Sequence, residues 1–170
     1  MLETKVIIED LPMGGDDNLE RRIFSEKGEM VQILNRPYEA FKHLVYWERD
    51  STNSGQERGH HSHERKTEHY YVFTGELELL LKDVESFVSK KLVVKAGNRL
   101  AISPRVAHAF RSLTYSQVLE YSPEPYDPSD THPYKVVVRL SWSDLYYNVP
   151  MTKCRTDLRH EVVGSCLLPI

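Results

Sequence analysis

Between residues 40 and 122 the chain repeats one pattern, in which short segments rich in β-forming residues are separated by turn signals. Clear examples are residues 68–73, 76–83 and 116–122, and Gly97-Asn98 marks a turn between two further segments. Few stretches of ten residues show the 3.6-residue period of a helix. Short strands at such regular spacing are typical of a sandwich or a closed barrel. We therefore expect an all-β fold with little helix.

The chain length predicts how this barrel is embedded. A chain of 170 residues fits one domain that spans 1–170. The barrel core is expected at about residues 40–122, preceded by strands within 1–39. An arm or a strand is expected within 123–170.

Two local signals refine this outline. Thr74-Gly75 predicts a tight hairpin between its flanking strands, because glycine adopts positive φ without a steric cost. Residues 122–134 carry four prolines and predict a long irregular connection. Residues 135–142 then read as one more strand.

Composition excludes several classes of function. The net charge is -3 and the pI is about 6.2, so no basic excess exists to neutralise nucleic-acid phosphates. No apolar run approaches the roughly 20 residues that cross a bilayer, and the N-terminus lacks the pattern of a signal peptide. We therefore expect no membrane partner and a cytoplasmic location. Cys154 and Cys166 are expected to be reduced, ordinary thiols.

The most unusual local feature is a group of three histidines at positions 60, 61 and 63. If residues 58–63 form a strand, side chains two apart lie on the same face. His61 and His63 then point together, whereas His60 points to the opposite face. The two imidazoles on one face are close enough for a single ion to bridge them.

Two further side chains complete a candidate ligand set. Glu68 begins the next predicted strand and offers a carboxylate, and His108 begins a later strand after a turn. Three imidazoles and a carboxylate suit a divalent transition metal such as Fe, Zn, Ni, Mn or Co better than Ca or Mg. The sequence therefore predicts one such ion, held by His61, His63, Glu68 and His108.

The spacing of these residues resembles the first motif of the cupin family. That motif reads Gly, five residues, His-x-His, three or four residues, Glu, six residues, Gly. At those positions the chain has Gly55, His61-Ser62-His63, Glu68 and Gly75. The resemblance implies a jelly-roll barrel, also called a double-stranded β-helix, with a metal site inside.

The second cupin motif is only partly present. It reads Gly, five residues, Pro-x-Gly, two residues, His, three residues, Asn. Gly97 and His108 keep this spacing, whereas Ser103, Arg105 and Ser112 replace the Pro, Gly and Asn. The resemblance therefore retains the metal ligand and loses the turn residues. Arg105 places a charge beside the expected mouth of the site.

Alternation along the strands extends the candidate site. Tyr70 shares a face with Glu68, and His43 shares one with Trp47. In the same way Phe110 shares a face with His108. Tyr70 and His43 are candidate acid–base residues, although a barrel-lining aromatic and a core or interface histidine are the more common roles of such residues. The candidate substrate-binding residues are Phe110, Arg105, Glu120 and Trp47.

A broader likeness concerns function. From residue 40 through the metal motif to His132 the chain resembles small cupins linked with nucleotide-sugar and surface-polysaccharide synthesis. The likeness implies metal-dependent isomerisation or epimerisation of a small oxygen-rich substrate, such as a sugar or sugar nucleotide. Two alternatives remain open, an iron-dependent dioxygenase and a non-catalytic cupin that binds a small molecule or sugar. A C₂ homodimer is expected, because partner subunits commonly cover sheet edges.

Overall fold

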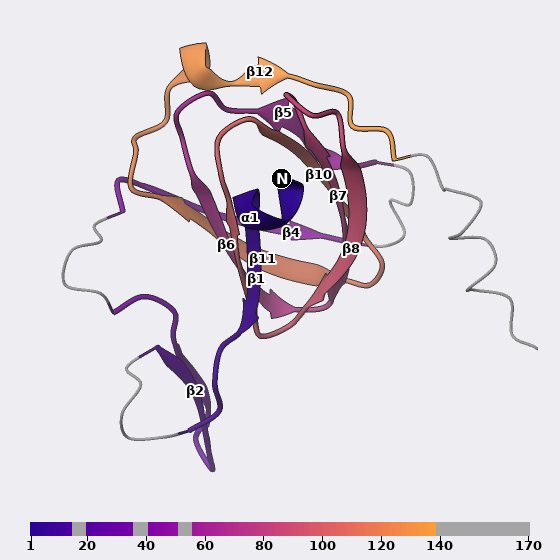
Figure 1. Ribbon diagram of the computed structural model, residues 1–170. Helices are drawn as coiled ribbons and strands as arrows, with labels where there is room; N and C mark the ends of the chain where they lie inside the picture. Colours follow the sequence, from indigo (N-terminus) through magenta and orange to yellow (C-terminus); the bar gives the residue numbers. More distant parts are fainter. Residues whose placement is uncertain (15–19, 36–40, 51–55, 139–170) are drawn as a thin grey trace, which may run out of the picture. The chain divides into compact units, whose positions relative to one another are not determined.

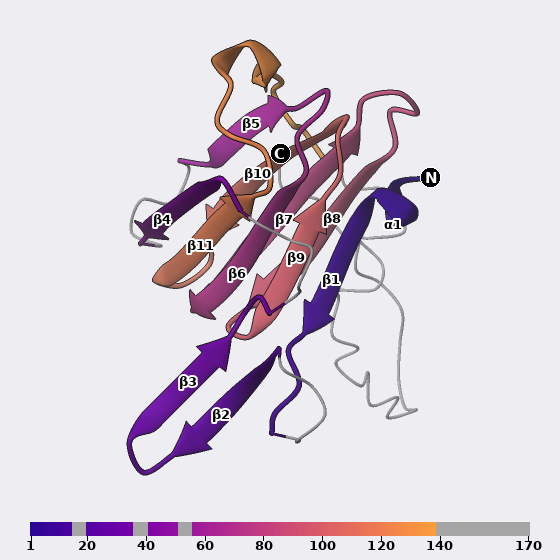
Figure 2. The ribbon, with the colours of Figure 1, turned by 90° about the vertical axis from the view of Figure 1, so that its left-hand side faces the viewer.

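The computed structural model describes residues 1–14, 20–35, 41–50 and 56–138 (Figure 1). Within these residues the strands form two five-stranded antiparallel sheets and one separate hairpin (Figure 2). The first sheet has the order β1 (Val6–Asp10), β9 (Asn98–Ile102), β6 (Glu68–Thr74), β11 (Ser116–Ser122) and β4 (His43–Arg49). The second has the order β12 (His132–Pro133), β5 (Arg58–Ser62), β10 (Val106–Ser112), β7 (Glu76–Asp83) and β8 (Ser89–Lys95). The predicted all-β fold with little helix is confirmed.

The apolar core lies between the two sheets and follows from the period-two alternation of the strands. On β7 the side chains of Leu77, Leu79 and Leu81 are completely buried, and they pack in one cluster with Val72 of β6. Burial of an aliphatic side chain of this size contributes about 1.5–3 kcal/mol. These contacts between the sheets therefore carry much of the stability of the fold.

The same alternation places polar groups in the interior. On β6 the residue two before the buried Tyr70 is Glu68, and on β10 the residue two before the buried Phe110 is His108. Glu68 is only 2% exposed and His108 only 1% exposed. A carboxylate and an imidazole therefore enter the protein on strands whose other inward residues form the core.

Gly75 marks a crossing between the sheets rather than a hairpin. It follows β6, which pairs with β9 and β11, and precedes β7, which pairs with β10 and β8. The predicted hairpin at Thr74-Gly75 is therefore wrong. Gly75 has φ of +84°, and a Cβ there would lie 2.8 Å from the Cα of Ser116, with the Tyr115 carbonyl oxygen closer still. The corner needs glycine both for its backbone angle and for the space that it leaves.

We expect Gly75→Ala to destabilise the protein by about 2–3 kcal/mol, because positive φ and an overpacked corner each carry a cost. Gly28→Ala is the matched control, since Gly28 also has positive φ but nothing lies within 4 Å of its added Cβ. Urea unfolding of both variants measures the difference. Equal losses of stability in the two variants would show that crowding at the corner contributes nothing.

The separate hairpin is formed by β2 (Arg21–Ser25) and β3 (Gly28–Gln32). Arg99 of β9 links this region to the first sheet. Its guanidinium donates hydrogen bonds to Glu9 of β1, to Glu20 just before β2 and to the carbonyl of Ile33 just after β3. A single buried cation thus joins the N-terminal strands to the barrel.

The connection after β11 is ordered around two short elements, the 3₁₀ helix η2 (Pro128–Asp130) and β12, which pairs with β5. The other described helix is α1 (Leu2–Lys5). No helix among the described residues is long and apolar enough to span a membrane. Residues 135–138 of the predicted strand 135–142 are not in a strand, and its other half lies outside the described residues. Both cysteines, Cys154 and Cys166, also lie outside them. The extent of the domain and the role of the tail stay predictions.

Candidate functional site

A cavity of about 450 Å³ is lined by residues of β4, β5, β6, β10 and β11, by the loop between β5 and β6, and by the connection after β11. It takes in the polar side chains that enter on β6 and β10. Nine of the ten site residues predicted from the sequence line it, namely His43, Trp47, His61, His63, Glu68, Tyr70, His108, Phe110 and Glu120. The strands thus bring together residues that are up to 77 positions apart along the chain, from His43 to Glu120.

Arg105 is the tenth predicted site residue, and it does not line the cavity. Its exposed guanidinium donates hydrogen bonds to Glu64 at 2.8 Å and to Glu85 at 2.6 Å. Its backbone has φ of +62°, in the turn between β9 and β10. This position removes the reason for assigning Arg105 to substrate binding, and its contacts indicate a role in joining two surface loops.

His61 is placed by a close approach of β5 to β10, where it pairs with His108. Gly59 allows this approach, because a Cβ at that position would lie 2.8 Å from the carbonyl oxygen of His108. The ring of His61 lies 4.7 Å from that of His108 and 5.0 Å from that of His63. His60 does not line the cavity, as predicted, and its Nδ1 accepts a hydrogen bond from the backbone of Val136.

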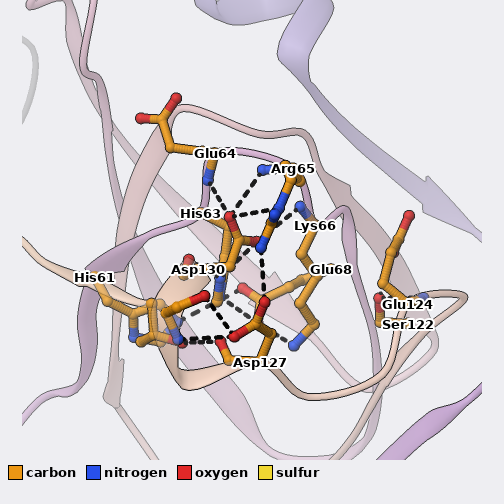
Figure 3. A network of polar contacts seen from close by, with 12 residues as sticks. His61, His63, Glu64, Arg65, Lys66, Glu68, Ser122, Glu124, Asp127 and Asp130 are labelled. Carbon is orange, nitrogen blue, oxygen red and sulfur yellow. Dashed lines mark hydrogen bonds and ion pairs between the residues drawn. The ribbon is translucent and has the colours of Figure 1, made fainter.

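Glu68 is the centre of a buried polar network (Figure 3). Its Oε1 accepts hydrogen bonds from His63 Nε2 at 3.0 Å and from Lys66 Nζ at 2.9 Å. Its Oε2 accepts from the Tyr70 hydroxyl at 3.0 Å and lies 3.1 Å from His108 Nε2. Burial alone would raise the pKa of Glu68, but hydrogen bonds from the surrounding histidines outweigh it and lower that pKa strongly. Glu68 is therefore an ionised carboxylate inside the protein.

His63 is fixed between Glu68 and the connection after β11. Its Nδ1 lies 2.7 Å from the backbone oxygen of Asp130, and its Nε2 faces Glu68. Because both ring nitrogens face acceptors, both carry protons and the ring is a cation. Burial lowers the pKa of His63, yet the hydrogen bond and charge of Glu68 and the Asp130 carbonyl raise it overall. The protonated ring of His63 thus places a positive charge next to Glu68.

This raised pKa predicts a pH dependence of folding. A group whose pKa is higher in the folded state stabilises the protein fully below its unfolded pKa, here 6.5, and less as pH rises through the folded value. We therefore expect the free energy of unfolding to fall as pH rises above 6.5, and His63→Gln to remove much of that slope. Urea unfolding at pH values below and well above 6.5 measures it. An unchanged slope in the variant would contradict a cationic His63.

Asp130 anchors the loop that carries His63 and Lys66. Its carboxylate accepts hydrogen bonds from the backbone N–H groups of Glu64, Arg65 and Lys66, at 3.1 to 3.2 Å (Figure 3). Asp130 is 5% exposed, so these bonds are shielded from water. The connection after β11 therefore fixes one wall of the cavity.

Tyr70 and His43 differ in how they face the cavity. The Tyr70 hydroxyl is buried, donates to Glu68 and lies 3.1 Å from His108 Nε2. Burial and the nearby carboxylates raise the pKa of Tyr70 well above its usual value, so the phenol stays protonated. His43 is partly exposed, with its Nδ1 3.3 Å from Lys66 Nζ and its ring 5.8 Å from that of Tyr126. Since an ammonium only donates, His43 Nδ1 is the acceptor and its proton lies on Nε2.

A second part of the lining is aromatic and carries a cation. The rings of Trp47 and Phe110 lie 5.5 Å apart, and the guanidinium of Arg58 lies 5.2 Å from the centre of the Trp47 ring. Such a surface suits the apolar face of a sugar together with an anionic group.

The fold is similar to those of solved sugar-nucleotide isomerases. QdtA, a sugar 3,4-ketoisomerase from Thermoanaerobacterium thermosaccharolyticum solved with TDP, is 20% identical with a TM-score of 0.60, over 75% of this chain and 86% of that one. The WlaRB TDP-quinovose 3,4-ketoisomerase from Campylobacter jejuni is 18% identical with a TM-score of 0.59, over 75% and 92%. The chain has the cupin fold.

A third structure agrees with this assignment. A dTDP sugar isomerase from Desulfovibrio desulfuricans is 16% identical with a TM-score of 0.63, over 81% of this chain and 90% of that one. No protein-family model matches the chain, and no curated protein sequence matches it as a relative. At these identities the likeness establishes the fold, and the cupin resemblance predicted from the sequence is confirmed.

These comparisons contradict the prediction of a divalent transition metal ion. The QdtA and WlaR ketoisomerases act without a metal cofactor. Ligand atoms of His61, His63 and Glu68 do lie within 4.8 Å of one another. However, the Lys66 ammonium is 2.9 Å from Glu68 Oε1 and is buried with it, so the carboxylate already has a cationic partner. The network does not fit a metal ion, and the iron-dependent dioxygenase reading loses its basis.

Sequence reasoning missed four residues that shape the site. Lys66, Arg58 and Tyr126 line the cavity, and Asp130 holds the loop beside it. Arg58 and Lys66 occupy variable positions of the first cupin motif, on either side of His61 and His63, and this nearness in sequence was the available signal. Tyr126 and Asp130 lie in the proline-rich connection, where no periodicity indicates which side chains face inward.

Proposed function

We propose that this protein is an isomerase that moves the carbonyl group of a keto sugar carried on a nucleoside diphosphate. The observation that carries the proposal is the group of imidazoles around an ionised Glu68, inside the cavity of a fold shared with sugar 3,4-ketoisomerases. Proton transfer by imidazole near neutral pH is the chemistry that such a reaction needs.

The reaction consists of proton transfers only. A base removes the proton from the hydroxyl-bearing carbon next to the carbonyl, and the electron pair moves onto the carbonyl oxygen to give an enediolate. Addition of a proton to the former carbonyl carbon, with loss of the neighbouring hydroxyl proton, gives the isomeric ketone. No oxidant, reductant or leaving group is required, so side chains of the cavity are sufficient.

We assign His61 as the base that removes the carbon-bound proton. Its side chain is 25% exposed, whereas those of His63 and His108 are 5% and 2% exposed, so His61 offers its ring to a ligand. Its Nε2 lies 3.7 Å from Glu68 Oε2, and that carboxylate stabilises the imidazolium formed on proton uptake.

The remaining candidates take supporting roles in this proposal. His43 carries a proton on Nε2 and is the second proton-transfer group, while Tyr70 holds Glu68 and His108 in place. Trp47 and Phe110 pack against the sugar. Glu120 accepts a hydrogen bond from a sugar hydroxyl. Arg58 binds the diphosphate through its guanidinium.

The proposal is tested with TDP-4-keto-6-deoxyglucose, the ligand with which a QdtA variant was crystallised. The expected result is a second keto sugar, separated from the first by chromatography. A rise in melting temperature without any product would instead support a binding module, because ligand binding alone stabilises the folded state.

The homodimer remains part of this proposal. Edge strand β4 exposes Leu44 and Tyr46, by 52% and 53% respectively, which supports cover by a second copy. The molar mass in solution tests it, with two chains per particle expected and one chain contradicting the dimer.

A further inference from the structure

The proposed isomerisation places negative charge on an oxygen that the substrate carbonyl brings into the cavity. Stabilisation of that charge by a fixed positive group or hydrogen-bond donor is usually the largest contribution to catalysis of this kind. Because the related ketoisomerases act without a metal ion, the positive group has to come from side chains. On the proposed function, one side chain of the cavity therefore supplies this positive group.

Among the described residues, three side chains that line the cavity are candidates for this positive group: Arg58, Lys66 and the protonated His63. Arg58 is exposed, and its guanidinium lies 5.2 Å from the centre of the Trp47 ring. His63 uses both of its N–H groups, on the Asp130 carbonyl and on Glu68. Arg58 is therefore not a buried cation, and His63 has no N–H left for a ligand.

Lys66 differs from both. It is 5% exposed, and its ammonium donates to Glu68 Oε1 at 2.9 Å and to His43 Nδ1 at 3.3 Å. Glu120 Oε1 lies 3.8 Å away, which is too far for a hydrogen bond. An ammonium has three N–H groups, so the described contacts leave one for a ligand in the cavity that Lys66 lines.

The position of Lys66 is also fixed before a ligand arrives. Its backbone N–H donates to Asp130 Oδ2 at 3.1 Å, and its ammonium group donates hydrogen bonds to Glu68 and His43. A charge that is already in place requires little reorganisation when negative charge develops nearby. We propose that Lys66 is a catalytic residue that donates an N–H to the enediolate oxygen and stabilises its negative charge.

The test compares Lys66→Ala and Lys66→Met, neither of which has a side-chain N–H, with the control Lys5→Ala in turnover of TDP-4-keto-6-deoxyglucose. Lys5 also forms ion pairs, with Asp83 and Glu85, but it does not line the cavity. Both Lys66 variants should lose about 10²–10³-fold in kcat, as when one donor to a developing oxyanion is removed, with KM changed only a few-fold. Lys5→Ala should keep the wild-type kcat. Melting temperatures identify the variants that fold, and Lys66→Met preserves most of the side-chain volume.

Chemical rescue separates a catalytic role from a structural one. Ethylammonium added to Lys66→Ala should restore turnover in proportion to its concentration, whereas tetramethylammonium, which has no N–H, should not. Folded Lys66 variants with kcat within a few-fold of wild type, or rescue by both cations alike, would overturn the role of Lys66 while the isomerase activity stood. A wild-type protein without turnover would overturn the proposed function, and this inference with it.

Discussion

His61→Asn is expected to lower turnover of the keto sugar by about 10²–10⁴-fold, the usual contribution of a positioned acid–base group. Asparagine keeps some of the polarity and volume of the ring but does not take up a proton at neutral pH. Substrate affinity should change little, because Trp47, Phe110 and Arg58 are unchanged in this variant. The loss should therefore appear in kcat rather than in KM.

His60→Asn is the matched control for this variant. His60 neighbours His61 on β5 but does not line the cavity, and its φ of +61° is one that asparagine tolerates. Steady-state kinetics of both variants, with melting temperatures to confirm folding, make the comparison. A folded His61→Asn protein whose kcat matches that of His60→Asn would exclude His61 as the base.

The second large effect concerns stability. Glu68→Ala is expected to cost about 3–5 kcal/mol of unfolding free energy, because removal of one partner leaves buried charges without compensation. The groups that lose their acceptor are His63, Lys66, Tyr70 and His108. The strongly lowered pKa of Glu68 gives the pH dependence its sign. The stabilisation is present above the ordinary value of 4.5 and is lost as pH falls below it.

Glu78→Ala provides the control. Glu78 forms ion pairs with Lys91 and Arg111, whose side chains are 41% and 44% exposed, so water compensates for the lost carboxylate. Such a pair contributes about 0–1 kcal/mol. Urea unfolding at neutral pH should show a much larger loss of unfolding free energy for Glu68→Ala than for Glu78→Ala. Below pH 4.5 this difference in the loss of unfolding free energy should become smaller. Similar losses at neutral pH would mean that Glu68 is not the centre of the network.

What the sequence predicted well was local. Period-two alternation placed Glu68 and Tyr70 on one face of a strand, and both do face the interior on β6. The same reasoning placed His108 with Phe110 on β10. These assignments depend only on neighbouring residues, which is why a single sequence was sufficient for them.

The errors arose where distant residues decide. Thr74-Gly75 has the composition of a hairpin turn, and only the strand pairing shows that Gly75 is a crossing between sheets. The contact of Asp130 with the loop at Lys66 joins residues 64 positions apart, and no local pattern reveals it. The metal prediction failed for a chemical reason: imidazoles around a carboxylate suit an ion or a protonated network equally well. A buried lysine on Glu68 favours the second.

The most direct test of the account follows the position of the carbonyl group by ¹³C NMR. The wild-type protein is incubated with TDP-4-keto-6-deoxyglucose in the presence of EDTA. The account predicts that the ketone signal moves from C4 to C3 at a rate that the chelator does not change. A sugar whose carbonyl stays at C4, or conversion that stops when the chelator is added, would contradict it.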